Sequence, residues 1–343
     1  MNASEPVSEP SAREPDVAHE AGGSGVEPAG EEPAPQPRVP TPAVARWRLW
    51  AFLAVPVLGV IEVGAHVREV TSVVPNGDWA LARDYVAAQV KPDDLILFAP
   101  RWTDPIGRMV FGDGLASMAR EARADDTRFA RAFEVSIRGG HAGELAGWRR
   151  VAAKKLGRVT VTTWENPSPL VVKEDLLSLV DPAHLTVSRG SDACPFARRG
   201  AESGSTGFGP AVPANRFACP GGSFVGISVF PDLDYNPHRA IFAPPGSGPP
   251  LRMRFQGVHF GRALRGHHGL YVEAEREERG APVTLKLTVD DKVLGTYVHH
   301  DGEGWKSFEL ATPELEGQQG DLVVEVSTPR ADRRTYLFEA STL

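Results

Sequence analysis

The longest run of hydrophobic side chains lies in the stretch 47–67, where thirteen consecutive uncharged residues precede Glu62. A helix needs about twenty mostly apolar residues to cross a bilayer, and the stretch reaches that length if Glu62 lies near the far interface. The pattern predicts a membrane-spanning helix over 46–68. A buried core helix is the alternative, because thirteen uncharged residues is also a length found in protein cores.

Helical periodicity alternates with short apolar runs over residues 75–168. The expected helices begin at Asp78, Asp104 and Ala142 and extend to about Pro92, Arg123 and Leu156, and the expected strands are 95–99, 133–137 and 159–164. Continuous apolar runs are typical of strands that are buried on both faces. The alternation predicts right-handed crossovers, and therefore a small α/β domain with a parallel sheet of three or more strands.

Beyond a connector at 169–182, short strand-like runs dominate residues 183–343. They are 184–188, 224–230, 240–243, 251–260, 269–275, 283–289, 293–299, 306–310, 322–327 and 335–340. In the run 283–289, Leu285 and Leu287 face one side and Lys286 faces the other, as in a strand that has one face buried in a core. Asp290-Asp291 then predicts a hairpin turn. So many strands predict a β-sandwich of jelly-roll type.

Residues 1–45 contain nine prolines, eight acidic residues and two basic residues, with few large apolar side chains. Such a segment cannot bury enough surface to offset the entropy of ordering, so we expect it to be disordered. It carries six of the seven net negative charges, which leaves the rest of the chain almost neutral. A nearly neutral body is not expected to bind nucleic acid or to hold anionic lipid at its surface.

The charges that flank the apolar stretch predict its orientation. Arg46 and Arg48 precede it, whereas Arg68 follows it beside a glutamate. The basic excess places the N-terminus in the cytoplasm, and the body then lies in the periplasm of a single-pass inner-membrane protein. A cleavable signal peptide is the alternative, since residues 63–65 resemble a cleavage site. Its charged region would be about 45 residues long, so we favour an uncleaved signal-anchor.

The chain has two cysteines, Cys194 and Cys219, and both follow the apolar stretch. In an oxidising compartment they are expected to form a disulfide that closes a loop rich in glycine, proline and serine. A zinc site is the alternative, but it is disfavoured because the sequence has no Cys-x-x-Cys motif and no histidine close to either cysteine.

Candidate binding residues follow the expected strands of the α/β domain. Arg101, Trp102 and Asp104 follow the first strand, Arg138 and His141 the second, and Glu165 the third. Ligands of parallel sheets bind beyond the carboxyl ends of the strands, and an aromatic ring among Arg, Asp and His would suit a sugar or a phosphate. The alternative is that these are ordinary polar loop residues and that Trp102 only covers the sheet.

The second domain has weaker candidates. Asp232-Leu233-Asp234 matches the Asp-x-Asp motif that holds divalent cations in glycosyltransferases, although so short a motif also occurs by chance. We expect no cofactor apart from a structural divalent cation there. Trp305 and Tyr271 would stack on a sugar ring or belong to the core. Histidines concentrate in this domain, and we expect exposed loop positions for them in preference to a metal site: His259, His267, His268, His299 and His300.

Two resemblances to known families rest on particular segments. The segments Asp78-Trp79, Lys91-Pro92-Asp93-Asp94-Leu95-Ile96-Leu97-Phe98-Ala99-Pro100 and Arg158-Val159-Thr160-Val161 resemble the extracytoplasmic tail of bacterial protein-mannosyltransferase-like glycosyltransferases. In that family the sugar-transfer acids lie between many membrane helices, so no catalytic residue can be carried over. Residues 283–338, with Leu294-Gly295, Asp301-Gly302, Gly304-Trp305 and Arg333-Arg334, are similar to galactose-binding-like jelly rolls. The second resemblance implies that the domain binds glycans or packs against a neighbouring domain.

These observations favour a membrane-anchored, non-catalytic protein that binds a glycan or assists a membrane glycosyltransferase. One alternative is an enzyme acting on envelope carbohydrate, with Asp232 and Asp234, or Asp104 and Glu165, as its acids. The Gly-x-Ser-x-Gly, Walker and His-Glu-x-x-His motifs are absent from the sequence, which weighs against three common kinds of enzyme. A structural envelope protein without a ligand is the third interpretation.

Overall fold

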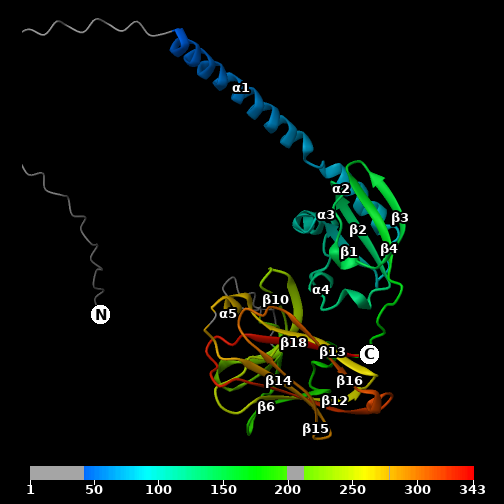
Figure 1. Ribbon diagram of the computed structural model, residues 1–343. Helices are drawn as coiled ribbons and strands as arrows, with labels where there is room; N and C mark the ends of the chain where they lie inside the picture. The colour runs from blue at the N-terminus through cyan, green and yellow to red at the C-terminus, as the bar shows by residue number, and fades with distance from the viewer. Residues whose placement is uncertain (1–41, 199–211, 278) are drawn as a thin grey trace, which may run out of the picture. The chain divides into compact units, whose positions relative to one another are not determined.

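The computed structural model describes residues 42–198, 212–277 and 279–343, which are drawn as ribbon in Figure 1. The chain divides into two compact units, 1–72 and 73–343. Most of the predicted disordered tail lies outside the described residues. The finer division of the second unit at 169–182 stays a prediction.

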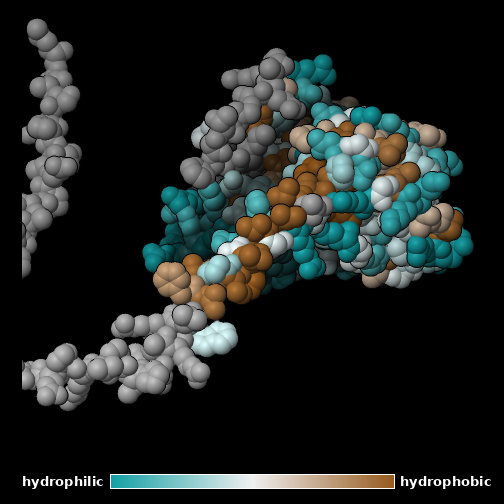
Figure 2. Space-filling model, turned by 90° about the horizontal axis from the view of Figure 1, so that it is seen from above, coloured by the Kyte–Doolittle hydropathy of each residue, from teal (hydrophilic) through white to brown (hydrophobic). Residues whose placement is uncertain are grey.

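The first unit contains the helix α1, Pro42–Ser72, which is longer than the predicted span. Its segment Trp50–Val70 is long and apolar enough to cross a membrane, and none of its residues is buried. Phe52, for example, is 85% exposed, and the helix is mostly brown in the hydropathy view of Figure 2. A core helix would instead have most of its apolar residues buried. Membrane anchors and signal sequences both have helices of this kind near the N-terminus.

The second unit begins with a four-stranded sheet in the order β1-β2-β4-β3. Its elements are α2 (Asn76–Ala87), β1 (Leu95–Ala99), α3 (Asp104–Phe111), α4 (Met118–Glu121), β2 (Arg131–Ile137), β3 (Arg149–Leu156) and β4 (Val159–Glu165). Trp79 of α2 and Phe111 of α3 pack with Phe98 and Phe133 on one face of this sheet. The burial of these aromatic side chains holds both helices against the strands.

The sheet corrects the prediction of a parallel α/β domain. β1 and β2 are parallel, but β2 and β3 both pair antiparallel with β4. The helix predicted over 142–156 is wrong, because β3 occupies most of this segment. Gly147 at φ +84° ends any helix, and Gly157 at φ +62° allows the tight turn into β4. Pairing with β4 therefore outweighs the helix propensity of the alanines and lysines.

The helix that we expected from Asp104 toward Arg123 is also interrupted. α3 ends at Phe111, and Gly112 with φ +68° reverses the chain before α4 begins at Met118. This reversal matters for the site, because it returns Glu121 toward the start of α3.

The rest of the second unit is an antiparallel sandwich. One sheet has the order β16-β13-β18-β11-β10-β9-β8, with β5 paired to β18, and the other has the order β15-β14-β17-β12-β6-β7. The strands are β5 (Glu174–Asp175), β6 (Leu185–Arg189), β7 (Asp192–Ala193), β8 (Phe196–Arg198), β9 (Asn215–Ala218), β10 (Phe224–Pro231), β11 (Pro237–Phe242), β12 (Leu251–His259), β13 (Ala263–Leu270), β14 (Val283–Val289), β15 (Lys292–His299), β16 (Lys306–Ala311), β17 (Gln319–Ser327) and β18 (Tyr336–Thr342). Short 3₁₀ turns lie at Arg101–Thr103, Asp126–Arg128, Gly143–Leu145, Leu176–Leu179, Pro220–Gly222 and Pro313–Leu315.

The predicted sandwich is confirmed by its core. Leu285, Leu287, Met253 and Phe255 from one sheet pack with Phe338 from the other, and all five are fully buried. Buried and half-buried residues alternate along β14, as its sequence predicted. Asp290 and Asp291 have φ of 47° and 62°, which fits the predicted hairpin turn between β14 and β15. The strand expected at 269–275 is wrong, because β13 ends at Leu270 and α5 (Val272–Arg276) follows.

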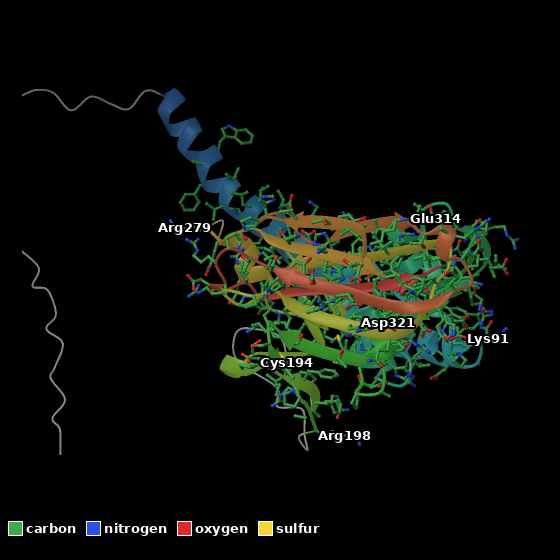
Figure 3. All side chains as sticks on the ribbon, turned by 90° about the horizontal axis from the view of Figure 1, so that it is seen from below. Lys91, Cys194, Arg198, Arg279, Glu314 and Asp321 are labelled. Atoms are coloured by element: carbon green, nitrogen blue, oxygen red, sulfur yellow. A yellow bond between two sulfur atoms is a disulfide. The ribbon has the colours of Figure 1, made fainter. Side chains whose placement is uncertain are left out.

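The predicted disulfide joins Cys194 and Cys219, which are separated by 25 residues. Both cysteines are buried against the sandwich core, and Figure 3 labels Cys194. The bond fixes the segment around β8 and β9 to the rest of the sheet.

Replacing both cysteines by serine is expected to lower the free energy of unfolding by about 3 kcal/mol, because the unfolded chain gains the entropy of an open loop. Urea unfolding of wild type and of the Cys194→Ser, Cys219→Ser variant measures the loss. Under a reducing agent the two proteins should then unfold at the same urea concentration. Equal stability without the reductant would contradict the prediction.

Candidate functional site

The carboxyl ends of the parallel strands β1 and β2 lie at one edge of the small sheet, and the loops that follow them touch. A Cβ atom added to Gly140 would lie 2.6 Å from Pro100, so the two loops pack without a side chain between them. The guanidinium of Arg138 lies over the ring of Trp102 at 5.9 Å. The residues that follow β1 and β2 therefore lie close together, as expected for the carboxyl ends of neighbouring parallel strands.

A cleft of about 620 Å³ lies beside these loops, within the second unit. Its lining comes from the end of β1 and the segment after it, the segment around α4, the turn at Gly143–Leu145, and the loop between β10 and β11. The polar and aromatic residues that line it are Phe98, Arg101, Trp102, Asp104, Glu121, Arg123, Asp125, Asp126, Glu144, Asp234, Tyr235, Asn236 and His238. Trp102 and Tyr235 are about 60% exposed, at 59% and 62%.

Contacts beside the cleft hold its walls in place. The backbone N–H of Arg239 donates to the carbonyl of Ala122 at 2.6 Å. Arg265 of the sandwich forms an ion pair of 3.4 Å with Asp125, which also accepts hydrogen bonds from Thr127. The loop of the sandwich and the segment around α4 therefore form a fixed frame for a ligand.

Two carboxyl groups meet on one wall of the cleft. The pKa of Glu121 is raised to about 7, first because the group is buried and then because the Asp104 carboxylate lies within hydrogen-bond reach. Arg123, 4.0 Å from Glu121, and Arg108, 3.7 Å from Asp104, offset part of the repulsion. Below this pKa the carboxyl group of Glu121 is protonated, and it can then both donate and accept a hydrogen bond.

The loop between β10 and β11 is built around Asp232. Its carboxylate accepts hydrogen bonds from the backbone N–H groups of Asp234 and Asn236, both at 2.9 Å, and from His238 Nε2 at 2.8 Å. Burial alone would raise the pKa of Asp232, but these hydrogen bonds outweigh it and hold the pKa below its ordinary value. Asp232 thus shapes the loop that carries Asp234 and Tyr235 into the cleft.

The metal hypothesis for Asp232 and Asp234 gains no support from this geometry. Both oxygens of Asp232 already accept hydrogen bonds. Among residues 42–198, 212–277 and 279–343, no group of three His, Cys, Asp or Glu side chains is arranged to hold a metal ion. A cation at this motif stays a prediction.

Other predicted site residues lie away from the cleft. Because β4 runs antiparallel to β2, Glu165 lies beside the first residue of β2, at the end of the strands opposite to the cleft, where it pairs with Arg149. The proposed pairing of Asp104 with Glu165 is therefore wrong, and Glu121 is the acid beside Asp104. The His141 Nδ1 bonds to the buried carboxylate of Glu134 at 2.7 Å, and neither of these two lines the cleft.

Trp305 and Tyr271 belong to a hydrophobic cluster of the sandwich. Trp305 packs edge-on against Phe230 and stacks with His238 at 4.7 Å and with His267 at 5.9 Å between ring centres. Tyr271 is half-buried against the same cluster. The structure therefore assigns these aromatic rings to packing, and the cleft presents Trp102 and Tyr235 in their place.

Two histidines that we expected in exposed loops are buried. His268 in β13 is 1% exposed and His299 at the end of β15 is 0% exposed. Their rings lie 5.2 Å apart, and the His299 Nε2 donates to the buried Glu275 at 2.6 Å. The pKa of His268 is lowered to about 3, first by burial and then by the neighbouring His299 and Lys306. The expectation was correct for His259 and His300, which are exposed.

Sequence reasoning missed Glu121, Arg123 and Tyr235 as parts of one site. Glu121 was assigned to a continuous helix, and only the reversal at Gly112 brings it to Asp104. Tyr235 was recognised as a loop residue, but nothing in the sequence shows which loop of the sandwich lies near β1.

No protein-family model matches the chain, and no curated protein sequence matches it. Among solved structures, it is similar to the CBM51-2 and INT domains of ZmpB from Clostridium perfringens, in complex with GlcNAc, with 11% identity and a TM-score of 0.29 over 74% of this chain and 48% of that one. It is also similar to the CBM51 of GH95 from Clostridium perfringens, in complex with methyl-galactose, with 11% identity and a TM-score of 0.23 over 40% of this chain and 88% of that one.

The chain thus spans about half the length of the first of these structures. The comparisons do not support the mannosyltransferase-like resemblance of residues 75–168. Carbohydrate-binding modules stand among the structural neighbours, but TM-scores below 0.5 do not establish a common fold. The function must therefore be inferred from the chain's own residues.

Proposed function

We propose that this chain is a membrane-anchored protein whose second unit binds a carbohydrate in the cleft lined by Trp102, Glu121 and Tyr235, without catalysing a reaction. The anchor is α1, and the basic residues before it favour a cytoplasmic N-terminus. The disulfide between Cys194 and Cys219 suits an oxidising compartment, which agrees with a body outside the cytoplasm.

The exposed ring of Trp102 on the wall of a polar cleft is the observation that carries the proposal. A sugar ring presents C–H groups on its faces and hydroxyl groups around its edge. An indole covers the apolar face, while carboxyl, amide and guanidinium groups bind the hydroxyls. Arg101 and Asp234 are exposed, and their side chains make no ion pair or hydrogen bond within the described parts of the chain, so both side chains are available to a ligand.

The raised pKa of Glu121 adds to this pattern. A protonated carboxyl group donates one hydrogen bond and accepts others, as a sugar hydroxyl does, so Glu121 can bind a hydroxyl in either sense. Arg123 also contacts Glu121 and Asp126, which limits the motion of this wall. A fixed polar wall reduces the entropy that binding must overcome.

The carboxyl pair also bears on the enzymatic alternative. In glycosidases the two catalytic carboxyl groups are about 5–10 Å apart, which leaves room for the sugar or a water molecule between them. The carboxylate of Asp104 instead lies close enough to Glu121 to raise the pKa of Glu121. This spacing favours binding over hydrolysis. A membrane glycosyltransferase as partner would rest on the sequence resemblance alone, so we leave it out of the proposal.

Replacing Trp102 by alanine is expected to weaken glycan binding about tenfold or more, because the apolar face of the sugar loses its platform. The measurement is retention of the full chain, in detergent, on an array of bacterial envelope glycans, followed by titration of the best ligand. Met109→Ala is the matched control, since Met109 is 75% exposed on α3 and does not line the cleft. Retention of no glycan by wild type, or equal affinity of the Trp102→Ala variant, would refute the proposal.

A further inference from the structure

The strand β3 is an exposed edge of the small sheet. It is the last strand in the order β1-β2-β4-β3, and seven of its eight residues are exposed. Its sequence is RRVAAKKL, and Arg158 follows directly after the turn at Gly157. The hairpin of β3 and β4 therefore carries five basic side chains and one acidic side chain, Glu165 at the end of β4.

Most of this positive charge is not neutralised within the protein. Arg149 pairs with Glu165. The side chains of Arg150, Lys154 and Lys155 form no ion pair or hydrogen bond in the parts of the chain that the structure describes. The near neutrality of the whole body conceals this local excess, which is why composition alone predicted no surface for anionic partners.

The tip of the hairpin is attached to the chain immediately after α1. The guanidinium of Arg158 donates to the carbonyl of Val73 at 3.0 Å, and its backbone N–H donates to the carboxylate of Asp78 at 2.8 Å. α1 ends at Ser72, so Val73 is the next residue. The basic hairpin is thus bound to the first residue that follows the apolar helix.

We propose that β3 and the turn that follows it bind the anionic lipid headgroups of the membrane in which α1 is anchored. The inference rests on the proposed anchor, but not on glycan binding. Phosphate oxygens accept hydrogen bonds from ammonium and guanidinium groups, and each basic side chain near an anionic surface strengthens association about fivefold. This attraction fades within about 8–10 Å at physiological salt, so the link between Arg158 and Val73 is what makes it effective.

An edge strand also displays unpaired backbone groups, and charged side chains there hinder pairing with another chain. That protective role does not depend on lipid composition. Comparing two membranes that differ only in charge therefore separates lipid binding from edge protection.

The test uses the full chain in nanodiscs of phosphatidylcholine, with or without phosphatidylglycerol. A water-soluble amine-acylating reagent is added, and modified lysines are identified by mass spectrometry. Acylation of Lys154 and Lys155 is expected to slow about fivefold or more with phosphatidylglycerol, and to recover at high salt. Lys292, exposed at the start of β15, is the internal control and should react equally in both membranes.

Hydrogen exchange over 149–158 provides a second readout. It should be slower with phosphatidylglycerol in wild type and unaffected by lipid in the variant Arg150→Gln, Lys154→Gln, Lys155→Gln. Equal acylation of Lys154 and Lys155 in both membranes would overturn the inference. A chain that does not co-purify with nanodiscs would overturn the anchor as well, whereas loss of glycan binding alone would leave this inference standing.

Discussion

Replacing Glu275 by leucine is expected to lower the free energy of unfolding by about 3–5 kcal/mol, because three hydrogen-bond donors, two of them buried, lose their acceptor. Glu275 is 1% exposed in α5. Its carboxylate accepts hydrogen bonds from His299 Nε2 at 2.6 Å, from the Leu270 N–H at 3.1 Å and from the Gly302 N–H at 2.7 Å. Leucine fills similar space but accepts nothing. Urea unfolding of the full chain in detergent measures the difference.

Two further variants show whether the effect comes from the lost acceptor. Glu275→Gln keeps one oxygen and should lose clearly less stability than the leucine variant. Glu273→Leu lies on the same short helix, and Glu273 makes no hydrogen bond or ion pair within the described segments, so we expect a change within about 0.5 kcal/mol. If Glu275→Leu were as stable as Glu273→Leu, the buried hydrogen bonds would have no net effect on stability.

Strand alternation made the sandwich predictable from the sequence. In β14, buried residues alternate with half-buried residues. A strand with this period of two can pack only one of its two faces against the core. The same local signal located β1, β2 and β4 to within two residues. It did not give the direction in which each strand pairs, because burial on both faces is compatible with parallel and antiparallel neighbours.

The segment 142–156 shows where local signals fail. Alanine, leucine and lysine favour a helix, and nothing in this segment alone opposes one except its glycines. The decisive interaction is pairing with β4, which follows only after the turn at Gly157. Because the expected helix extended to Leu156, the hairpin was missed. The basic edge that β3 forms was missed with it.

The candidate site was predictable in part. Trp102 and Asp104 follow a strand that belongs to a parallel pair, and the rule for parallel sheets correctly placed them at a cleft. The other walls come from Glu121, behind a chain reversal, and from Tyr235, more than a hundred residues further along. The contacts of Glu121 and Tyr235 with the cleft depend on packing between segments that lie far apart in the sequence, and no local sequence pattern predicts this packing. The buried His268 was missed for a similar reason, since its neighbours come from β15, β16 and β18.

Stability should also fall by about 3 kcal/mol between pH 7 and pH 4 because of His268, whose pKa of about 3 lies well below the 6.5 of an exposed histidine. Between these two values the unfolded chain binds a proton that the folded chain does not. Each step down in pH through this window therefore favours unfolding, and the contribution is complete only above pH 6.5. The largest cause is burial among rings, including those of Tyr297 and Phe308, and the charge of Glu303 offsets only part of this effect.

His268→Leu removes the titrating group while keeping a side chain of similar size. In the variant, the loss of stability between pH 7 and pH 4 should be smaller than in wild type by about that 3 kcal/mol, with little change at pH 7. His300→Leu is the control, because His300 is 61% exposed and its removal should leave the acid dependence unchanged. Urea unfolding of wild type and the two variants at pH 7 and pH 4 gives one loss of stability for each of the three proteins. If His268→Leu lost as much stability in acid as wild type, the proton would be taken up elsewhere, and the Glu275–His299 pair in the same core would be the next group to replace.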